Sequence, residues 1–362
     1  MLTYNILLLY IILVSIFFDI RESKKKKIIY LFLIFIPMTI IMGIRNISVG
    51  TDTSLYCSIF KYIANENFDT ALSQYPIVWV SINKIISLIG TDNVNYIFSI
   101  AVLINLFVAK FIYDNSDDVK MSVILYILSY FYFTSFNIGR QFLSMAICVY
   151  AYKYLNNKNK KETIKFMLLV LLAIGIHPTA IIFMLCILTL LKPKRKNIIL
   201  CLISMSLIMV AFVPISNIFV RYFPHYEIYV NEEGITQHGF GVGKNRSSIM
   251  TLIYIFFELI MIYLFNTNKN NNIDKKILFN FIIINGIGCL WGIMSLTSIM
   301  FSRFARYFNL FSIIYIPYVF KYIKKDQVLI VEVIYFFIMF IPYYIQLNDN
   351  ISGVVPYIIG SL

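Results

Sequence analysis

Long runs of hydrophobic residues, separated by short polar segments, make up most of the chain. A run of roughly 20 apolar residues is long enough to cross a bilayer as a helix. The pattern predicts crossings at 3–20, 28–44, 95–113, 120–136, 138–155, 198–218, 248–266, 277–300, 304–322 and 328–345. It therefore predicts an all-α polytopic membrane protein in which residues 1–362 form one integral membrane domain.

Two further apolar segments need a closer look. Residues 164–191 hold His177-Pro178 near their middle, and proline disfavours a helical conformation at the preceding residue. We predict a hairpin of two short arms with His177 at its outer tip, because a single crossing would place the basic segment 192–196 outside. Residues 76–89 are short for a crossing and hold Lys84, so we predict an interfacial or re-entrant helix there.

This predicted topology has about 12 crossings with both termini extracytoplasmic. It leaves two extracytoplasmic loops, 45–94 and 219–247, and the second holds His225 and His238. The glycines and tyrosines of loop 219–247 suit a mobile lid.

Composition and charge support the membrane class. The chain is 60% hydrophobic and 14% charged, whereas soluble domains are about half apolar and about 25% charged. The net charge of +13 comes from short basic clusters between the apolar runs, as the positive-inside rule predicts for cytoplasmic loops. No continuous basic face for nucleic acid is present. Four of the five cysteines lie in apolar runs, so neither a disulfide nor a cysteine zinc site is predicted.

Arginine is distributed differently from lysine. With this threading, 20 of the 23 lysines fall on the cytoplasmic side, whereas six of the eight arginines fall outside: Arg45, Arg140, Arg221, Arg246, Arg303 and Arg306. A guanidinium binds phosphate through two parallel hydrogen bonds and keeps its charge. We therefore predict an outer site for a lipid diphosphate. The alternative for each arginine is snorkelling toward the headgroups.

Three other residues on the outer side are candidates for chemistry. Asp52 in VGTDT either activates a hydroxyl or pairs with Arg45. His177 is a general base, a phosphate ligand or a polar partner for a proline-broken helix. Tyr307 either stacks on a sugar or belongs to the interfacial aromatic belt.

Other features narrow the chemistry. Glu258 lies inside a predicted crossing and is expected to have a structural partner, Asn280 or Asn285. The outer side has no DxD motif, and the chain has no Walker A, GxSxG or HExxH motif. No metal or cofactor is predicted, and the arginines would stabilise the leaving diphosphate.

Four motifs occur in an order that resembles a known family. Arg45 and VGTDTSLY are followed by NIGRQFLSMA, GIHPTA and RFARYF, and together they span roughly 40–345. They resemble the EpsG-like branch of the Wzy-type polymerases of bacterial exopolysaccharide, O-antigen or capsule. The first motif, R-x-x-x-V-G-x-D-T-x-x-Y, is the most specific.

The resemblance implies a GT-C-like glycosyltransferase in the bacterial cytoplasmic (inner) membrane with an extracytoplasmic active face. Such an enzyme joins oligosaccharide repeat units carried on undecaprenyl diphosphate, and the lipid diphosphate is the leaving group. The expected partners are this lipid-linked glycan, membrane lipid and a candidate chain-length regulator protein. By motif position, the implied catalytic residues are Asp52, Arg140 and His177, and the implied substrate-binding residues are Arg45, Gly50, Thr53, Tyr56, Gln141, Arg303, Arg306 and Tyr307.

Three other functions fit a similar architecture. An O-antigen ligase also displaces undecaprenyl diphosphate, and the residues alone do not separate it from a polymerase. A lipid-linked oligosaccharide flippase would place its cations in a central cavity. A polysaccharide acyltransferase would need a catalytic histidine near a cytoplasmic entrance, whereas His177 is predicted outside.

Overall fold

The computed structural model describes residues 1–362 apart from 21–22, 156–158, 223–245, 268–271, 297–298 and 361–362. In some helices it gives the backbone only, at 209, 212–222, 246–248, 272 and 299–300. The described part is helical and contains no strand beyond one isolated bridge between Arg45 and Ile359. Loop 219–247, with His225 and His238, lies largely outside the described residues, and so do the side chains of Arg221 and Arg246.

The helices follow one another along the whole chain. Their bounds are α1 Leu2–Phe17, α2 Lys24–Gly43, α3 Thr53–Asn65, α4 Phe68–Leu72, α5 Ile77–Ser87, α6 Asn93–Asn115, α7 Val119–Leu128, α8 Phe131–Asn137, α9 Gly139–Ala151, η1 Tyr152–Leu155, α10 Lys160–Ile176, η2 Pro178–Leu190, α11 Arg195–Tyr222, α13 Arg246–Thr267, α14 Asn272–Met294, α15 Ile299–Asn309, α16 Ser312–Phe320, α17 Lys325–Asn348 and η5 Ile351–Gly353.

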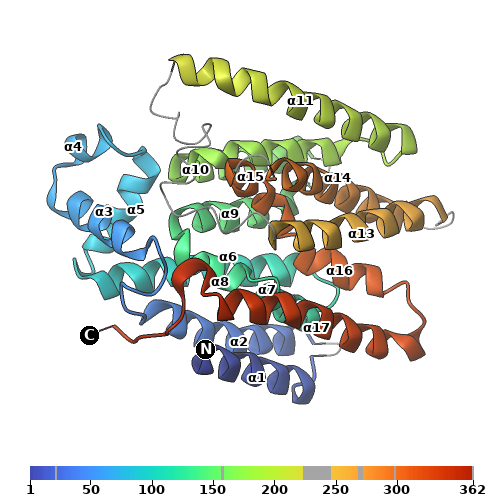
Figure 1. Ribbon diagram of the computed structural model, residues 1–362, viewed down its shortest axis with the longest axis horizontal. Coiled ribbons are helices and arrows are strands. Elements are labelled where there is room, and N and C mark those ends of the chain that lie inside the picture. The colour runs from blue at the N-terminus through green and yellow to red at the C-terminus, as the bar shows by residue number, and fades with distance from the viewer. Residues whose placement is uncertain (21–22, 156–158, 223–245, 268–271, 297–298, 361–362) are drawn as a thin grey trace.

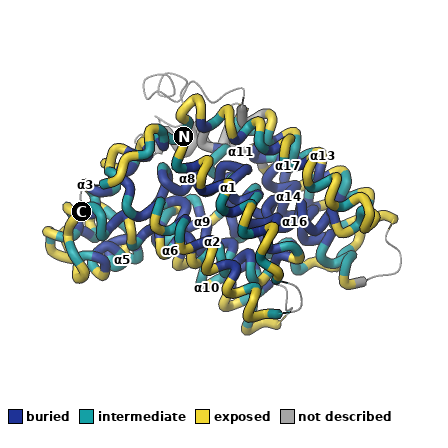
Figure 2. Tube along the Cα trace, turned by 90° about the horizontal axis from the view of Figure 1, so that it is seen from below, coloured by how far each residue is buried: buried dark blue, intermediate teal, exposed yellow. Residues whose placement is uncertain are grey.

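Most long helices run side by side across the bundle, and α3, α4 and α5 gather at one end of it (Figure 1). Among the described residues, five helices are long and apolar enough to cross a membrane, or six if the bent pair α7 and α8 is one span. The outward side of α17 exposes apolar side chains such as Leu329, Phe337 and Ile341, and the buried residues lie between the helices (Figure 2). An apolar exterior of this kind suits lipid. The chain is a multi-pass membrane protein.

Several predicted boundaries agree with the structure. α10 ends at Ile176, His177 is extended, and η2 starts at Pro178, so the predicted break at His177-Pro178 is confirmed. α5 is a short apolar helix inside 45–94, as expected. The predicted structural partner of Glu258 is Asn285, whose Nδ2 donates to Glu258 Oε2 over 2.9 Å.

Three predicted crossings are not single helices, and two of them are 120–136, formed by α7 and α8, and 138–155, formed by α9 and η1. The third, segment 304–322, is two helices, α15 and α16, separated at residues 310–311. α15 carries Arg303, Arg306 and Asn309 among aromatic residues, and a helix with a polar face of this kind packs inside the protein rather than spanning lipid. The count of 12 crossings, the GT-C-like fold and the outward orientation of the termini stay predictions.

The loops sort to the two ends of the bundle. Loops predicted to be cytoplasmic meet at one end, where Lys27 Nζ donates to Tyr113 O (2.9 Å) and Lys321 lies 3.6 Å from Asp117 and 3.5 Å from Asp274. At the other end the two termini come together.

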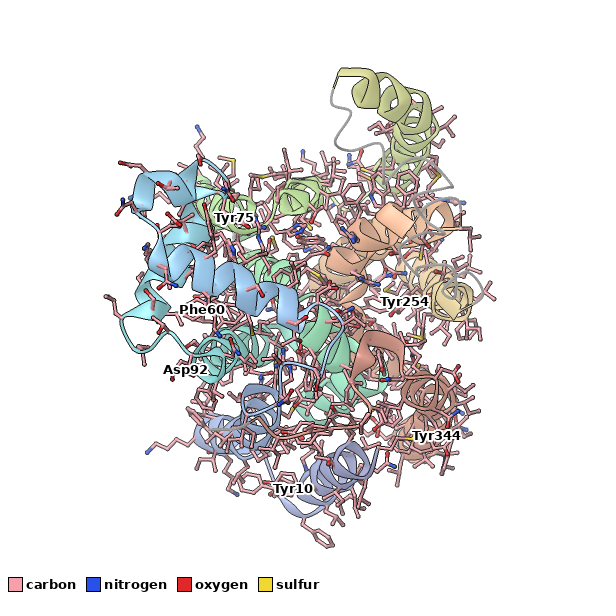
Figure 3. All side chains as sticks on the ribbon, turned by 60° about the vertical axis from the view of Figure 1, so that its left-hand side comes forward. Tyr10, Phe60, Tyr75, Asp92, Tyr254 and Tyr344 are labelled. Atoms are coloured by element: carbon pink, nitrogen blue, oxygen red, sulfur yellow. The ribbon has the colours of Figure 1, made fainter. Side chains whose placement is uncertain are left out.

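Near the N-terminus, Tyr4 OH donates to Val354 O over 2.8 Å. Asn46, just after α2, donates its N–H to Ile358 O over 2.8 Å. Figure 3 brings this end forward and labels Phe60 on α3, Tyr75 and Asp92 around it. The end that holds both termini is therefore also the end that holds loop 45–52.

This sorting predicts a labelling pattern. A cysteine at exposed Ser48 should react with a membrane-impermeant thiol reagent in intact cells, and one at exposed Lys194 should react only after permeabilisation. The five natural cysteines are buried and give little background. Labelling at position 194 from outside would contradict the two-sided arrangement and move His177 away from the outer face.

Candidate active site

Arg45 holds the loop that follows α2. Its side chain is 5% exposed, and Nε donates to Val49 O (3.2 Å), Nη2 to Phe136 O (3.1 Å) and Nη1 to Met42 O. Its guanidinium carbon lies 4.7 Å from the centroid of the Phe136 ring. Burial lowers the pKa of Arg45 to about 10. Because three carbonyls engage this guanidinium, it is a structural group, and the predicted contact of Arg45 with a diphosphate does not fit this geometry.

The two arginines at this end of the bundle should respond differently to mutation. Arg45→Gln leaves buried carbonyls without donors, at about 1–3 kcal/mol each, so we expect a clear drop in unfolding temperature. Arg140→Gln should change the unfolding temperature far less, because the Arg140 side chain makes one such bond. Thermal unfolding of both variants in detergent tests this, and equal drops would contradict it.

Gly50 and Thr53 shape the tight turn of the loop. Gly50 has φ +97°, and a Cβ there would lie 2.7 Å from Phe136 O and 2.5 Å from Thr53 Oγ1, so only glycine fits without strain. Thr53 is buried, and its Oγ1 donates toward Val49 O (2.8 Å) and Phe136 O (3.2 Å). Both residues, predicted to bind substrate, pack the loop against the end of α8.

Asp52 sits at the start of α3, held by Asn137. The Asp52 N–H donates to Asn137 Oδ1 over 2.9 Å, and the Thr51 hydroxyl donates to the same oxygen. The Asp52 side chain makes no capping bond to α3. Among the described residues Asp52 has no ion pair with Arg45, so that alternative is wrong. Partial burial raises the pKa of the Asp52 carboxyl, and the positive charge of Arg303 and a Thr51 hydrogen bond partly offset the rise.

Arg140 begins α9 beside the tip of the hairpin. Its Nε donates to Ile176 O over 2.7 Å, and its guanidinium carbon lies 5.3 Å from the centroid of the Trp79 ring on α5. No hydrogen bond of its Nη groups is found within the described part of the chain. Arg140 is therefore held at its Nε while its Nη groups are left for an anion. Nearby Tyr56 lines a cavity of about 10 Å³ with Arg45.

His177 belongs to a chain of hydrogen bonds. Its Nδ1 lies 2.7 Å from Thr179 Oγ1 and accepts the Thr179 N–H over 3.4 Å. Thr179 Oγ1 lies 3.0 Å from Tyr307 OH, which lies 3.3 Å from Ser144 Oγ. Since Nδ1 accepts a backbone N–H, the ring proton belongs on Nε2. Burial, with the positive charges of Arg140 and Arg303, lowers the pKa of His177 to about 3, so the ring is neutral at pH 7.

Tyr307 is fully buried. Its ring therefore offers no face to a sugar and does not lie in an interfacial aromatic belt. It acts through its hydroxyl, which holds the hydrogen-bond chain of His177.

α15 brings Arg303 into this group. Buried Gln141 on α9 donates Nε2 to Arg303 O over 3.1 Å, so Gln141 positions α15 through its backbone. The charge of Arg303 acts on Asp52 and His177 and also on Arg306, one helical turn further. Arg303 thus acts on Asp52, His177 and Arg306, and Arg140 acts on His177, so these five residues from four separate segments lie at one end of the bundle.

Three positioning residues escaped prediction: Asn137, Thr179 and Ser144. Each lies inside a motif, in NIGRQFLSMA or GIHPTA, two or three residues from a residue that was predicted. Their position within these motifs was the available signal. Their hydrogen bonds depend on partners in other helices, which spacing does not reveal.

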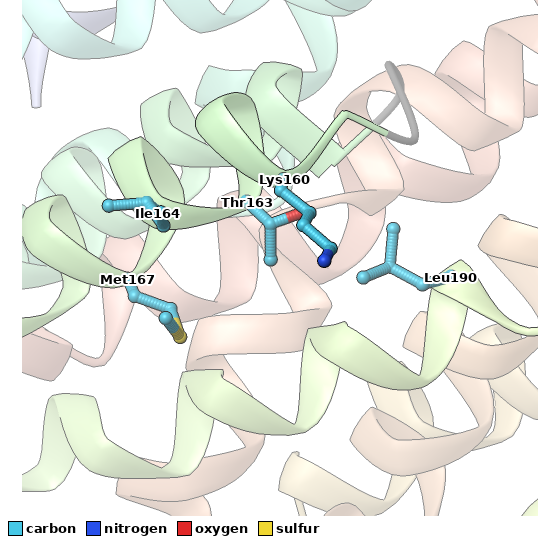
Figure 4. Close-up of a pocket in the computed structure, with 5 residues that line it drawn as sticks. All are labelled: Lys160, Thr163, Ile164, Met167 and Leu190. Carbon is cyan, nitrogen blue, oxygen red and sulfur yellow. The ribbon is translucent and has the colours of Figure 1, made fainter.

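A larger cavity of about 490 Å³ lies between α10 and η2 (Figure 4). It is lined by Lys160, Thr163, Ile164, Met167 and Leu190. The four lining residues of α10 lie toward its start, whereas Ile176, which accepts the Arg140 hydrogen bond, lies at its end. The cavity is therefore several helical turns from Arg140. A single lysine among mostly apolar side chains offers no acid–base pair, so the candidate chemistry lies at the arginine end. Among the described residues, no three His, Cys, Asp or Glu side chains group closely enough to hold a metal ion.

The fold and site define a class: a multi-pass helical membrane protein with arginines, an aspartate and a neutral histidine gathered at one end of the bundle. The model of the EpsG family matches residues 28–359. The chain belongs to this family, the family of Wzy-like exopolysaccharide polymerases, and the predicted resemblance is confirmed. No curated protein and no solved structure matches the chain.

Proposed function

We propose that the protein is a repeat-unit polymerase that acts on glycans carried by undecaprenyl diphosphate. It transfers the growing glycan from its lipid to the non-reducing end of a new lipid-linked unit at the outer leaflet. The observation that supports this most is the grouping of Arg140 and Arg303 around Asp52 and His177. Family membership supports an exopolysaccharide polymerase in general.

Each group in the site has a part in glycosyl transfer. An acceptor hydroxyl attacks the anomeric carbon of the donor glycan, the bond from that carbon to the diphosphate oxygen breaks, and the diphosphate leaves with the electron pair. Arg140 and Arg303 stabilise the growing negative charge on the diphosphate. Arg306 adds charge one turn away.

Asp52 accepts the proton of the acceptor hydroxyl, since a carboxyl with a raised pKa is a better base than an ordinary one. His177 is a neutral donor. Its Nε2–H donates a hydrogen bond to a phosphate oxygen, while Thr179 holds Nδ1 in place. This division assigns the base to Asp52.

The same chemistry with another acceptor describes a ligase, and the family favours the polymerase. A flippase receives less support because the arginines gather at one end of the bundle. An acyltransferase with a cytoplasmic entrance also receives less support than the polymerase, because His177 lies away from the lysine-rich end of the bundle. We also propose membrane lipid and a chain-length regulator protein as partners, and the cytoplasmic membrane as the location.

The glycan profile of a strain lacking the gene tests the proposal. Polymerase function predicts that only single repeat units remain, on lipid or at the surface, and that wild type but not Arg140→Ala restores the ladder. Full-length polymer that stays on undecaprenyl diphosphate would indicate a ligase. A normal ladder that lacks one substituent would indicate a modifying enzyme.

A further inference from the structure

The last residues of the chain return to the candidate active site. After α17 ends at Asn348, Asn350, Ser352 and Gly353 adopt positive φ values of 51°, 75° and 64°. These turn the chain, and residues 349–360, here called the C-terminal clasp, then run alongside the loop that precedes Asp52.

Backbone hydrogen bonds join the clasp to this loop at both of its ends. Asn46 N donates to Ile358 O and Gly360 N to Ile44 O, each over 2.8 Å. Gly50 N donates to Gly353 O over 2.8 Å, and the Thr51 N–H donates to Ser352 O over 3.2 Å. Residues 44–51 are thus tied to the clasp at both ends, and the last of these bonds is one residue before Asp52.

Three tyrosine hydroxyls anchor the clasp to the bundle. Tyr4 of α1 donates to Val354 O (2.8 Å), and Tyr130, at the break between α7 and α8, donates to Ile351 O (2.5 Å). Tyr357 of the clasp donates to Ile41 O of α2 (2.9 Å). Val354 is fully buried. These contacts make the clasp a fixed support, since its peptide groups are tied to helices on several sides.

Asp52 is therefore held between two supports. Asn137 binds Thr51 and the Asp52 N–H from one side, and Ser352 and Gly353 bind the peptide groups of Thr51 and Gly50 from the other. The contact with the clasp is close: a Cβ on Gly353 would lie 2.9 Å from Thr51 Cγ2 and 3.2 Å from Thr51 N. A side chain at Gly353 would push on the peptide next to Asp52.

We infer that the C-terminal clasp is a positioning element of the active site, which sets the place of Asp52 through Ser352, Gly353 and Gly360. The assignment of its effect to catalysis rests on the proposed function. Because the clasp pairs with the loop that carries Asp52, it is expected to govern turnover more than substrate binding.

Gly353→Val tests the inference in a polymerisation assay with purified protein and lipid-linked repeat units. We expect kcat to fall by about 10-fold or more with KM changed by less than about 3-fold, because misplacing a catalytic group by about 1 Å costs up to about 100-fold. The kcat of Gly353→Ala should lie between those of wild type and Gly353→Val. Ile359→Ala, whose side chain is 60% exposed, is the matched control and should keep the wild-type rate. A normal kcat in Gly353→Val, or an effect confined to KM, would overturn the inference.

A double-mutant cycle separates positioning from general loss of folding. Asn137→Ala releases the same loop from its other side, so the effects of Asn137→Ala and Gly353→Val on kcat should be non-additive, with the double variant close to the worse single one. Effects that multiply would overturn the inference. If wild type makes no polymer, the proposed function fails. The same three variants are then compared by unfolding temperature. Additive shifts would overturn the inference that the clasp and Asn137 hold the same loop.

Discussion

Asp52→Asn is expected to lower polymer formation by about 100-fold or more, the usual contribution of a general base. Asparagine keeps the size of the side chain and leaves the Asp52 N–H bonded to Asn137, so the loop should stay in place. The lipid-linked donor should still bind, because Arg140 and Arg303 are unchanged. Turnover and substrate binding, measured separately on the purified variant, test this.

Asp69→Asn is the control for this variant, because Asp69 is an exposed acid on the same segment, 45–94. It should polymerise at the wild-type rate. His177→Asn should also lose turnover, through the lost bond to the diphosphate. If Asp52→Asn and His177→Asn both polymerise normally, the proposed mechanism is wrong.

Arg303→Gln is the second change with a large expected effect. Its positive charge acts on Asp52 and on His177, and we place it on the leaving diphosphate. Removing one group that stabilises a developing negative charge costs about 100–1,000-fold in kcat. Arg195→Gln, at the start of α11 on the lysine-rich end, should leave kcat unchanged.

The pH profile gives Arg303→Gln a second readout. Asp52 must be ionised to act as a base, so wild-type activity should fall on acidification through a pKa above the ordinary carboxyl value near 4. Arg303 lowers the pKa of Asp52. Without that charge the pKa rises, and the acidic limb should move to higher pH. An Arg303→Gln variant with the wild-type rate and the wild-type acidic limb of the pH profile would contradict the role of Arg303.

Local sequence signals predicted local structure well. The break at His177-Pro178 follows from the steric effect of proline on the preceding residue, and the structure has it. Apolar length was a poorer guide at 304–322, because hydropathy does not register that Arg303, Arg306 and Asn309 give α15 a polar face. The gathering of several arginines at one end of the bundle was expected from their distribution, and the outward orientation of that end stays a prediction.

Roles that depend on distant partners could not be predicted. Arg45 was expected at the diphosphate because a guanidinium on the predicted outer side suits phosphate. Only the fold shows that carbonyls of Met42, Val49 and Phe136 engage it. The action of Arg303 on Asp52 and the pairing of Gly50 with Gly353 join segments far apart in sequence. Neither leaves a periodic signal in the chain.

Reconstitution tests the central claim most directly. Purified protein in vesicles is given undecaprenyl-diphosphate-linked repeat units, and the products are separated by size while released undecaprenyl diphosphate is measured. Repeat-unit polymerisation predicts a ladder of lipid-linked glycans, with one undecaprenyl diphosphate released for each unit added and neither product formed by Asp52→Asn. Single units that persist beside active, correctly folded protein, or a ladder made equally by Asp52→Asn, would contradict the account.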